Sequence, residues 1–225
     1  MEEKQHIGKL FDRIAAHYDG LNHLLSLNID KRWRRKAVRG MRHHQEVLDV
    51  AIGTADFAIE LIREGRAQAV TGLDLSPEMM KIGQTKAEGL PIRFVEGSAL
   101  QMPFAEGAFD AVTCSFGCRN FSDLDRGLRE FHRVLRPDGE LCMLEFSYPA
   151  NPFARWVYDL YFSHILPAIG GWVSHDRAAY RYLNRSVKNF VWGEALAERL
   201  RQAGFKAVTY QPLSFGIATV YRATK

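Results

Sequence analysis

Three short segments in the first half of the chain contain residues that could together bind a nucleoside-like ligand. Gly53 follows an apolar run at 47–51, and a glycine at the end of a strand lets backbone approach a ligand closely. Asp74 follows the next apolar run, where its carboxylate could accept hydrogen bonds from ribose hydroxyls, each contributing roughly 1.5–3 kcal/mol. Ser98 and Ala99 follow the third run and could meet an adenine edge.

Each segment also has a structural explanation. Asp74 or Ser76 could cap the following helix, with Pro77 at its first position, and 96–104 could be an ordinary loop. The segment 52–56 departs from the G-x-G-x-x-G pattern that places a pyrophosphate at a helix N-terminus, since only Gly53 is a glycine. A ligand without a pyrophosphate is therefore favoured.

The spacing of apolar residues predicts the elements that position these segments. Short apolar runs predict strands at 47–51, 69–73, 92–95, 109–114 and 141–146, and amphipathic stretches predict helices at 56–64, 77–87 and 124–135. Buried strands that alternate with helices predict a doubly wound α/β fold around a mostly parallel sheet. In such a sheet ligands bind beyond the carboxyl ends of the strands, where Gly53, Asp74 and Ser98 are expected.

The 225 residues suit one domain with four consecutive parts. Residues 1–45 are expected to form a helical lead, with one helix at about 22–41, and residues 46–148 the ligand-binding core. Residues 149–190 predict a helical insertion rich in aromatic side chains, which contains Arg155, Asp159 and His164 and so is not expected to span a membrane. Residues 191–225 predict a helix at 192–203 and two edge strands at 207–211 and 217–221.

The composition narrows the class of protein. Hydrophobic residues make up 47% and charged residues 25%, which excludes a disordered chain, a collagen-like repeat and a polytopic membrane protein. The formal charge of +4 is too small to indicate nucleic-acid binding. Three cysteines are too few for a disulfide framework, and no apolar signal segment follows the first residue. A cytoplasmic location is expected, with peripheral contact at the inner membrane face left open.

These signals together resemble a class I S-adenosylmethionine-dependent methyltransferase, which has a Rossmann-like, seven-stranded, mostly parallel sheet. Residues 104–113 resemble the segment that leads into strand four of that superfamily. Residues 133–147 resemble its turn into strand five, where Gly139 gives the backbone the freedom that the turn needs.

Further segments resemble one family within it, the ubiquinone/menaquinone biosynthesis C-methyltransferases. Residues 18–26 with 31–33 resemble its N-terminal signature, S-F-G-C-R-N at 115–120 the segment after strand four, and L-E-F-S-Y-P at 144–149 the end of strand five. Residues 180–186 and 215–218 are also similar, so the resemblance covers essentially the whole chain. It implies contacts with S-adenosylmethionine at Gly53, Thr54, Asp74, Ser98, Ala99 and Ser115.

The resemblance implies transfer of a methyl group to a ring carbon of a prenylated quinol, with demethylmenaquinol as the expected acceptor and the benzoquinol of ubiquinone synthesis as the alternative. Arg119 is expected to stabilise the quinolate, because a guanidinium stays protonated, or else to form a structural ion pair. Asn120 and Tyr180 are further catalytic candidates, and no metal is expected. Weaker candidates are His17, Tyr18, Asp19, Asn22 and Glu145.

Several residues depart from the family pattern, namely Ile52 and Ala55 in the cofactor loop, together with Asp30, Asp138 and Tyr221. Ile52 stands where a small residue is usual, which places a branched side chain where the carboxypropyl end of the cofactor is expected. Ala55 replaces a glycine. These departures leave open a protein that binds S-adenosylmethionine without catalysis. A nucleic-acid methyltransferase is disfavoured, because no N/D-P-P-Y/F motif follows strand four.

Two stretches predict contacts beyond the catalytic core. The aromatic residues of 153–173 could form a pocket or an interfacial face for an isoprenoid tail, or simply pack a helical cap. The seven basic side chains of 31–42 are expected on a solvated helix face or against anionic lipid headgroups. The aromatic insertion could also serve a homodimer.

Overall fold

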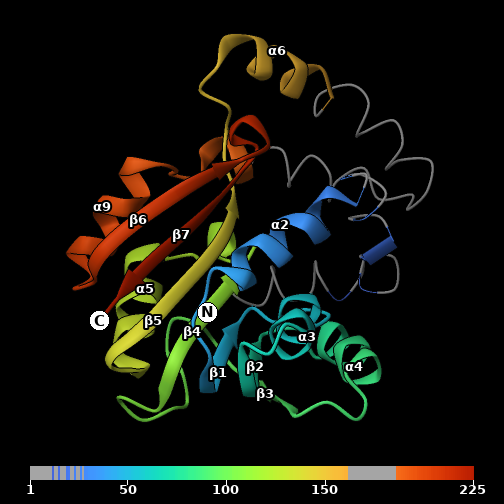
Figure 1. Ribbon diagram of the computed structural model, residues 1–225, viewed down its shortest axis with the longest axis vertical. Helices are drawn as coiled ribbons and strands as arrows, with labels where there is room; N and C mark the ends of the chain where they lie inside the picture. Colours follow the sequence, from blue (N-terminus) through green and yellow to red (C-terminus); the bar gives the residue numbers. More distant parts are fainter. Residues whose placement is uncertain are drawn as a thin grey trace.

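The computed structural model describes residues 28–161 and 186–225, together with Asp12, Ala15, Asp19, Gly20, His23 and Ser26. Its centre is a seven-stranded sheet with the strand order β3-β2-β1-β4-β5-β7-β6 (Figure 1). The strands are β1 (His44–Val50), β2 (Ala67–Asp74), β3 (Ile92–Glu96), β4 (Phe109–Ser115), β5 (Leu135–Phe146), β6 (Lys206–Leu213) and β7 (Ala218–Thr224). β1 to β5 pair in parallel, whereas β7 runs antiparallel to both of its neighbours. The predicted doubly wound, mostly parallel sheet is confirmed.

Helices cover both faces of this sheet (Figure 1). α2 (Ile29–Arg39), α3 (Asp56–Arg63) and α4 (Pro77–Lys86) contribute to the apolar core on one face, and α5 (Leu124–Val134) and α9 (Glu194–Gln202) to the core on the other. α6 (Pro152–Leu160) extends beyond the carboxyl end of β5. None of the helices in the described part of the chain is long and apolar enough to cross a membrane.

Local sequence explains where the helices begin. Ser76 caps α4 by accepting a hydrogen bond from the Met79 amide at 3.2 Å, and Pro77 occupies the first helical position, where its missing N–H is not needed. Asp123 caps α5 in the same way through the Arg126 amide at 2.9 Å. Ser76, rather than Asp74, is therefore the cap of the helix that follows β2.

Three of the differences from the expectation have a visible structural reason. β7 lies between β5 and β6, so of the two C-terminal strands that were expected at the edge only β6 is an edge strand. β5 begins at Leu135, because residues 136–139 form a bulge opposite β4 in which Asp138 adopts a left-handed φ of 61°. α2 begins at Ile29, because Asn28 before it has a φ of 59° and cannot continue a helix.

Asp49 is an ionisable residue inside the core. It lies on the central strand β1 and is 1% exposed. Its carboxylate accepts a hydrogen bond from the Thr113 hydroxyl at 2.7 Å on the neighbouring strand β4. Burial raises the pKa of Asp49 to about 7, although the Thr113 hydrogen bond opposes the shift. The folded protein therefore prefers Asp49 protonated, unlike the unfolded chain.

This preference predicts a pH-dependent stability. Because the pKa of Asp49 is raised in the folded state, ionised Asp49 lowers the free energy of unfolding. This loss is fully present above about pH 7 and is relieved as the pH falls toward the pKa of the unfolded chain. Relative to Asp49→Asn, the wild type should gain about 2–3 kcal/mol of unfolding free energy between about pH 8 and about pH 5. Urea denaturation of both proteins at the two pH values measures this. A difference that stays constant with pH would contradict the assignment.

Candidate active site

A cavity lies at the carboxyl ends of β1, β2 and β4 and reaches the loop after β3. Its wall is built from the four connections that leave the sheet at this edge, as expected for a doubly wound fold. The lining residues are Val50, Ala51 and Gly53 after β1, Leu73 to Ser76 with Met79 after β2, Gly97 to Leu100 after β3, and Ser115 to Gly117 with Asn120 to Ser122 after β4.

The turns that form this wall hold several residues in the left-handed backbone region. After β1, Ala51 has a φ of 56°, Gly53 of 54° and Ala55 of 66°. After β4, Phe116 has a φ of 58°. This conformation costs an L-residue roughly 1–2 kcal/mol, and only glycine adopts it freely. The chain therefore carries backbone strain at the cavity. Such strain is commonly found at functional sites.

Asp74 joins two of these turns. One carboxylate oxygen accepts a hydrogen bond from the Gly53 amide at 2.8 Å, and the other accepts one from the Ser76 amide at 2.9 Å. Burial raises the pKa of Asp74, while the two amides act in the opposite direction. The Asp74 carboxylate therefore fixes the loop after β1 against the start of α4. Asp74 also lines the cavity.

Ser98, Ala99 and Ser115 also line the cavity. The Ser98 hydroxyl accepts a hydrogen bond from the Leu100 amide at 3.2 Å, which shapes the loop after β3. The Ser115 hydroxyl is buried and has no hydrogen-bond partner within the described part of the chain. Because buried polar groups are nearly always paired, this hydroxyl on the cavity wall fits a site for a polar ligand. A small ligand with several hydroxyl and amine groups suits these residues.

Comparison with known proteins identifies the family. The family model described as the ubiE/COQ5 methyltransferase family matches residues 1–225. The chain belongs to this family.

Individual relatives of the family cover nearly the whole chain. A demethylmenaquinone methyltransferase of Deinococcus radiodurans is 45% identical over 228 residues, which span 100% of this chain and 94% of the relative. A protein of Citrifermentans bemidjiense named ubiquinone/menaquinone biosynthesis C-methyltransferase UbiE is 43% identical over 231 residues, spanning 100% and 98%. Among solved structures, an S-adenosylmethionine-dependent methyltransferase of Thermotoga maritima is 19% identical with a TM-score of 0.70 and covers 96% of this chain and 99% of its own. That likeness shows the fold.

The structure brings most of the predicted cofactor residues of this family member together. Gly53, Asp74, Ser98, Ala99 and Ser115 all line the cavity. Thr54 is not part of the wall; it is 4% exposed, and its hydroxyl donates a hydrogen bond to Asp19 at 2.5 Å. The Thr54 hydroxyl is thus engaged with Asp19 outside the wall, and the place of Thr54 among the cofactor contacts stays a prediction.

The catalytic candidates are separated. Asn120 lines the cavity, whereas Arg119 does not. The Arg119 guanidinium lies 2.8 Å from Glu145 in a buried ion pair, which is the structural alternative considered for this residue. Tyr180 lies outside the described residues, as do His17, Tyr18 and Asn22.

The structure places Ile52 outside the cavity wall. Ile52 is 5% exposed and belongs to the apolar core beneath α3 rather than to the cavity wall. Its side chain fills the space beside Gly72 on β2, where a Cβ on Gly72 would lie 2.1 Å from Ile52 Cδ1. Ile52 therefore faces away from the cofactor cavity. Ala55 keeps the left-handed backbone that its glycine counterpart would adopt, at the cost of some strain.

Several wall residues were not found from the sequence. Leu75, Met79 and Phe121 supply much of the apolar lining, and Gly97 lies close enough to Leu73 that a Cβ would clash at 2.7 Å. The only signal for them was their position just after predicted strands. Neither Met79 nor Phe121 carries chemistry that a motif would reveal.

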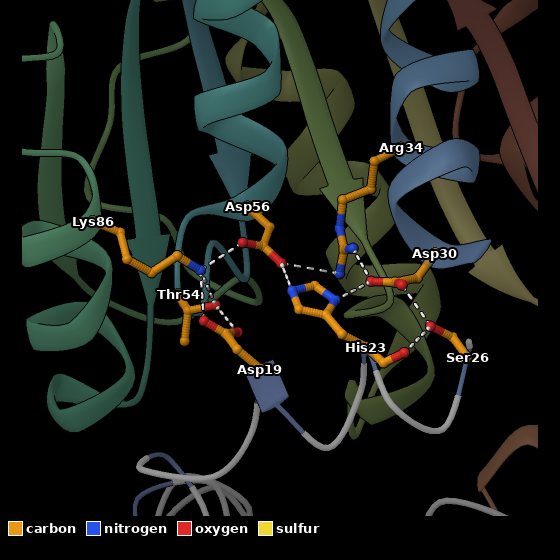
Figure 2. A network of polar contacts seen from close by, with 8 residues as sticks. All are labelled: Asp19, His23, Ser26, Asp30, Arg34, Thr54, Asp56 and Lys86. Carbon is orange, nitrogen blue, oxygen red and sulfur yellow. Dashed lines mark hydrogen bonds and ion pairs between the residues drawn. The ribbon is translucent and has the colours of Figure 1, made fainter. Parts of the chain in front are cut away.

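A network of ion pairs beside the cavity ties the N-terminal segment to α3 and α4 (Figure 2). Lys86 at the end of α4 lies 2.6 Å from Asp19 and 2.5 Å from Asp56 at the start of α3. Asp19 also accepts the hydrogen bond from Thr54, directly after the cavity residue Gly53. Lys86 therefore links an N-terminal carboxylate to the segment that leaves β1. We call Lys86, Asp19, Asp56 and Thr54 together the Lys86 clasp.

The second half of the network lies at the start of α2 (Figure 2). His23 Nδ1 lies 2.8 Å from Asp30, and Arg34 forms ion pairs with both Asp30 and Asp56. Burial alone would raise the pKa of Asp56, but Arg34 and Lys86 hold it below its ordinary value. His23, Asp30 and Asp56 approach one another closely enough to share a metal ion. Arg34 already bonds both carboxylates, however, so the arrangement is an ion-pair network.

Removing the cation of the Lys86 clasp should weaken the fold. Lys86→Met leaves Asp19 and Asp56 without their shared partner, and we expect it to lower the unfolding free energy by about 1–2 kcal/mol at low salt. The loss should shrink at about 1 M salt, which screens charges over roughly 3 Å. Lys81→Met on the exposed face of the same helix is the matched control and should stay within about 0.5 kcal/mol. Equal losses in both variants would contradict a specific role for Lys86.

Proposed function

We propose that this chain methylates a ring carbon of a prenylated quinol with S-adenosylmethionine, and that its acceptor is demethylmenaquinol. The observation that carries the proposal is the family match over residues 1–225, with a relative of that name 45% identical across the whole chain. The cavity supports it, because Asp74, Ser98 and Ser115 gather there at the carboxyl edge of the sheet. The benzoquinol remains the second candidate acceptor, because the printed name of another relative includes ubiquinone synthesis.

The wall residues fit the parts of S-adenosylmethionine. Asp74 would accept hydrogen bonds from its ribose hydroxyls, and Ser98 and Ala99 would border its adenine. Gly53, with no Cβ and a φ of 54°, lets the loop after β1 approach the ligand. When bound, S-adenosylmethionine supplies a methyl group already activated by its sulfonium. The chain therefore has to position the acceptor and exclude water rather than activate the donor.

The acceptor carbon becomes nucleophilic when the quinol oxygen loses its proton. Asn120 is a polar residue after β4 that lines the cavity beside Phe121 and is a candidate to contact that oxygen. Arg119 lies one residue before it but behind the wall, with its charge paired to Glu145. We assign Asn120 to orienting the acceptor oxygen and give Arg119 no direct contact with it, because Glu145 neutralises the Arg119 charge.

The test of the proposed function is a labelled-methyl assay on matched quinols. Purified protein is incubated with methyl-labelled S-adenosylmethionine and either demethylmenaquinol or the demethylated benzoquinol, under reducing conditions. Label in the naphthoquinol, located on a ring carbon by mass spectrometry, supports the proposal. Label only in the benzoquinol selects the second candidate. Cofactor binding without transfer to either quinol would leave a binding protein and overturn the proposal.

Asp74 offers a direct test of the cofactor half. Asp74→Asn loses one acceptor for the Gly53 or Ser76 amide and the charge for the ribose, so we expect the Kd for S-adenosylmethionine to rise about 10–100-fold. Asp110→Asn is the matched control, because Asp110 also accepts from two backbone amides, those of Gln45 and Glu46, at the opposite edge of the sheet. Calorimetry measures both. An unchanged Kd in Asp74→Asn would remove Asp74 from the site.

We also propose that the chain contacts a lipid surface through α6. Phe153 and Trp156 on α6 are 72% and 62% exposed and stack on each other, and Phe215 in the 3-10 turn before β7 is 87% exposed. Such exposed aromatic side chains suit an interfacial contact, and a prenylated acceptor resides in lipid. The basic face of α2 supports this less than expected, because Arg35 pairs with Glu60 of α3 and Arg39 pairs with Glu64 directly after α3.

Vesicle sedimentation tests the lipid contact. Wild-type protein should sediment with vesicles that contain phosphatidylglycerol, and Trp156→Ser should weaken that binding at least about fivefold because it removes exposed apolar area from the contact. Tyr210→Ser on the edge strand β6, 39% exposed, is the control and should bind as the wild type does. Equal binding of all three proteins would exclude α6 as the contact.

A further inference from the structure

The turn after β4 forms one whole side of the cavity. Six of the eight residues of 115–122 line the cavity, including Phe116, Gly117 and Asn120. This turn cannot simply relax against its neighbours. A Cβ on Gly117 would lie 2.6 Å from Ala51 Cβ and 2.9 Å from Cys114 Sγ, so the backbone packs directly against the end of β1.

Phe116 holds the sharpest bend of this turn. Its amide still follows the sheet, donating a hydrogen bond to the Leu144 carbonyl on β5 at 2.7 Å. Its φ of 58° then turns the chain out of the sheet in a conformation that an aromatic residue adopts only when its surroundings enforce it. The ring packs 4.4 Å from that of Phe146, the last residue of β5. Something must hold the Phe116 carbonyl in this orientation.

Arg119 and Glu145 supply that restraint. The Arg119 guanidinium donates a hydrogen bond to the Phe116 carbonyl through Nη1 and contacts Glu145 Oε1 with the same nitrogen at 2.8 Å. The Arg119 backbone amide donates to the other Glu145 oxygen at 3.3 Å. Glu145 therefore binds residue 119 at both its backbone and its side chain. The side chains of Arg119 and Glu145 are 5% and 1% exposed, so water competes little for these contacts.

We propose that Glu145 is a positioning residue for the cofactor cavity. It fixes Arg119, and through Arg119 it holds the Phe116 turn in the left-handed conformation that forms the cavity wall. The charge of Arg119 is used chiefly to brace this backbone rather than to contact the acceptor. The inference rests on the proposed function only for the identity of the ligand, which is the adenosyl cofactor or its demethylated product.

The test compares two glutamates on the same strand. Glu145→Asp keeps the charge but shortens the side chain, so the carboxylate no longer reaches both groups of Arg119. Glu140→Asp is the matched control, because Glu140 is also buried on β5 and contacts His44 at 2.8 Å, but lies five residues before Glu145 on the strand. Keeping the charge matters, because burial chiefly, and the charge of Glu145 in addition, raise the pKa of the neighbouring Cys118 thiol, which serves as a reporter below.

The first readout is calorimetric binding of S-adenosylhomocysteine, which involves no turnover. We expect Glu145→Asp to raise its Kd at least about tenfold and Glu140→Asp to leave it within about twofold. The second readout is alkylation of individual cysteines by N-ethylmaleimide, followed by mass spectrometry. Cys118 lies in the turn, and Cys142 lies in the middle of β5; both are buried in the wild type.

Local loosening of the turn predicts a rise of about tenfold or more in the alkylation rate of Cys118 in Glu145→Asp, with Cys142 unchanged. Glu140→Asp should leave Cys118 at its wild-type rate. Wild-type binding and wild-type Cys118 reactivity in Glu145→Asp would overturn the proposal. So would a parallel rise at Cys118 and Cys142, since that reports a general loss of stability rather than a positioned turn.

A second variant covers a failure of Glu145→Asp to fold. Arg119→Lys keeps the positive charge, but a lysine side chain is one atom shorter, so its ammonium does not reach the position from which Arg119 Nη1 contacts both the Phe116 carbonyl and Glu145. Arg119→Lys should also weaken the binding of S-adenosylhomocysteine and raise the alkylation rate of Cys118. A wild-type result in both readouts would contradict the proposal that Arg119 and Glu145 hold the Phe116 turn. The outcome is separable from the proposed function. If the wild type binds no S-adenosylhomocysteine, the proposed cofactor fails, while Cys118 reactivity still decides whether Glu145 holds the turn.

Discussion

One carboxylate sets the geometry on which the rest of this site depends. Asp74 accepts hydrogen bonds from the amides of Gly53 and Ser76, and so ties the loop after β1 to the first residue before α4. Burying a carboxylate is costly, and its pKa is raised accordingly. The two amide bonds offset that cost and leave the carboxylate on the cavity wall. The left-handed turns at Ala51, Gly53 and Phe116 then close the cavity around it.

The fold could be predicted because its signal is local. Each strand of the parallel sheet is a short apolar run, each covering helix has an apolar face, and both patterns are visible in consecutive residues. The placement of Gly53, Asp74 and Ser98 at one edge followed from topology alone, since the carboxyl ends of parallel strands meet there. The helix start at Pro77 was equally readable, because Ser76 and Pro77 are the residue types that a first turn needs.

What the sequence could not reveal depends on long-range contacts. Arg119 and Glu145 are 26 residues apart, and only the pairing of β4 with β5 brings them together. The direction of Ile52 was misjudged because the space that receives its side chain belongs to Gly72 on another strand. The ion pairs of Lys86 with Asp19 and Asp56 likewise join three separate segments. The residue type of Arg119 suggested a catalytic role, but its burial and its ion pair with Glu145 show that its charge is already engaged within the fold.

The most direct measurement of the central claim is a crystal structure of the protein with S-adenosylhomocysteine. The account predicts the ligand in the cavity at the carboxyl ends of β1, β2 and β4, with its ribose hydroxyls hydrogen-bonded to Asp74 and its adenine bordered by Ser98 and Ala99. It also predicts that Ile52 makes no contact with the ligand. A ligand bound elsewhere, or bound in this cavity without contact to Asp74, would contradict the account.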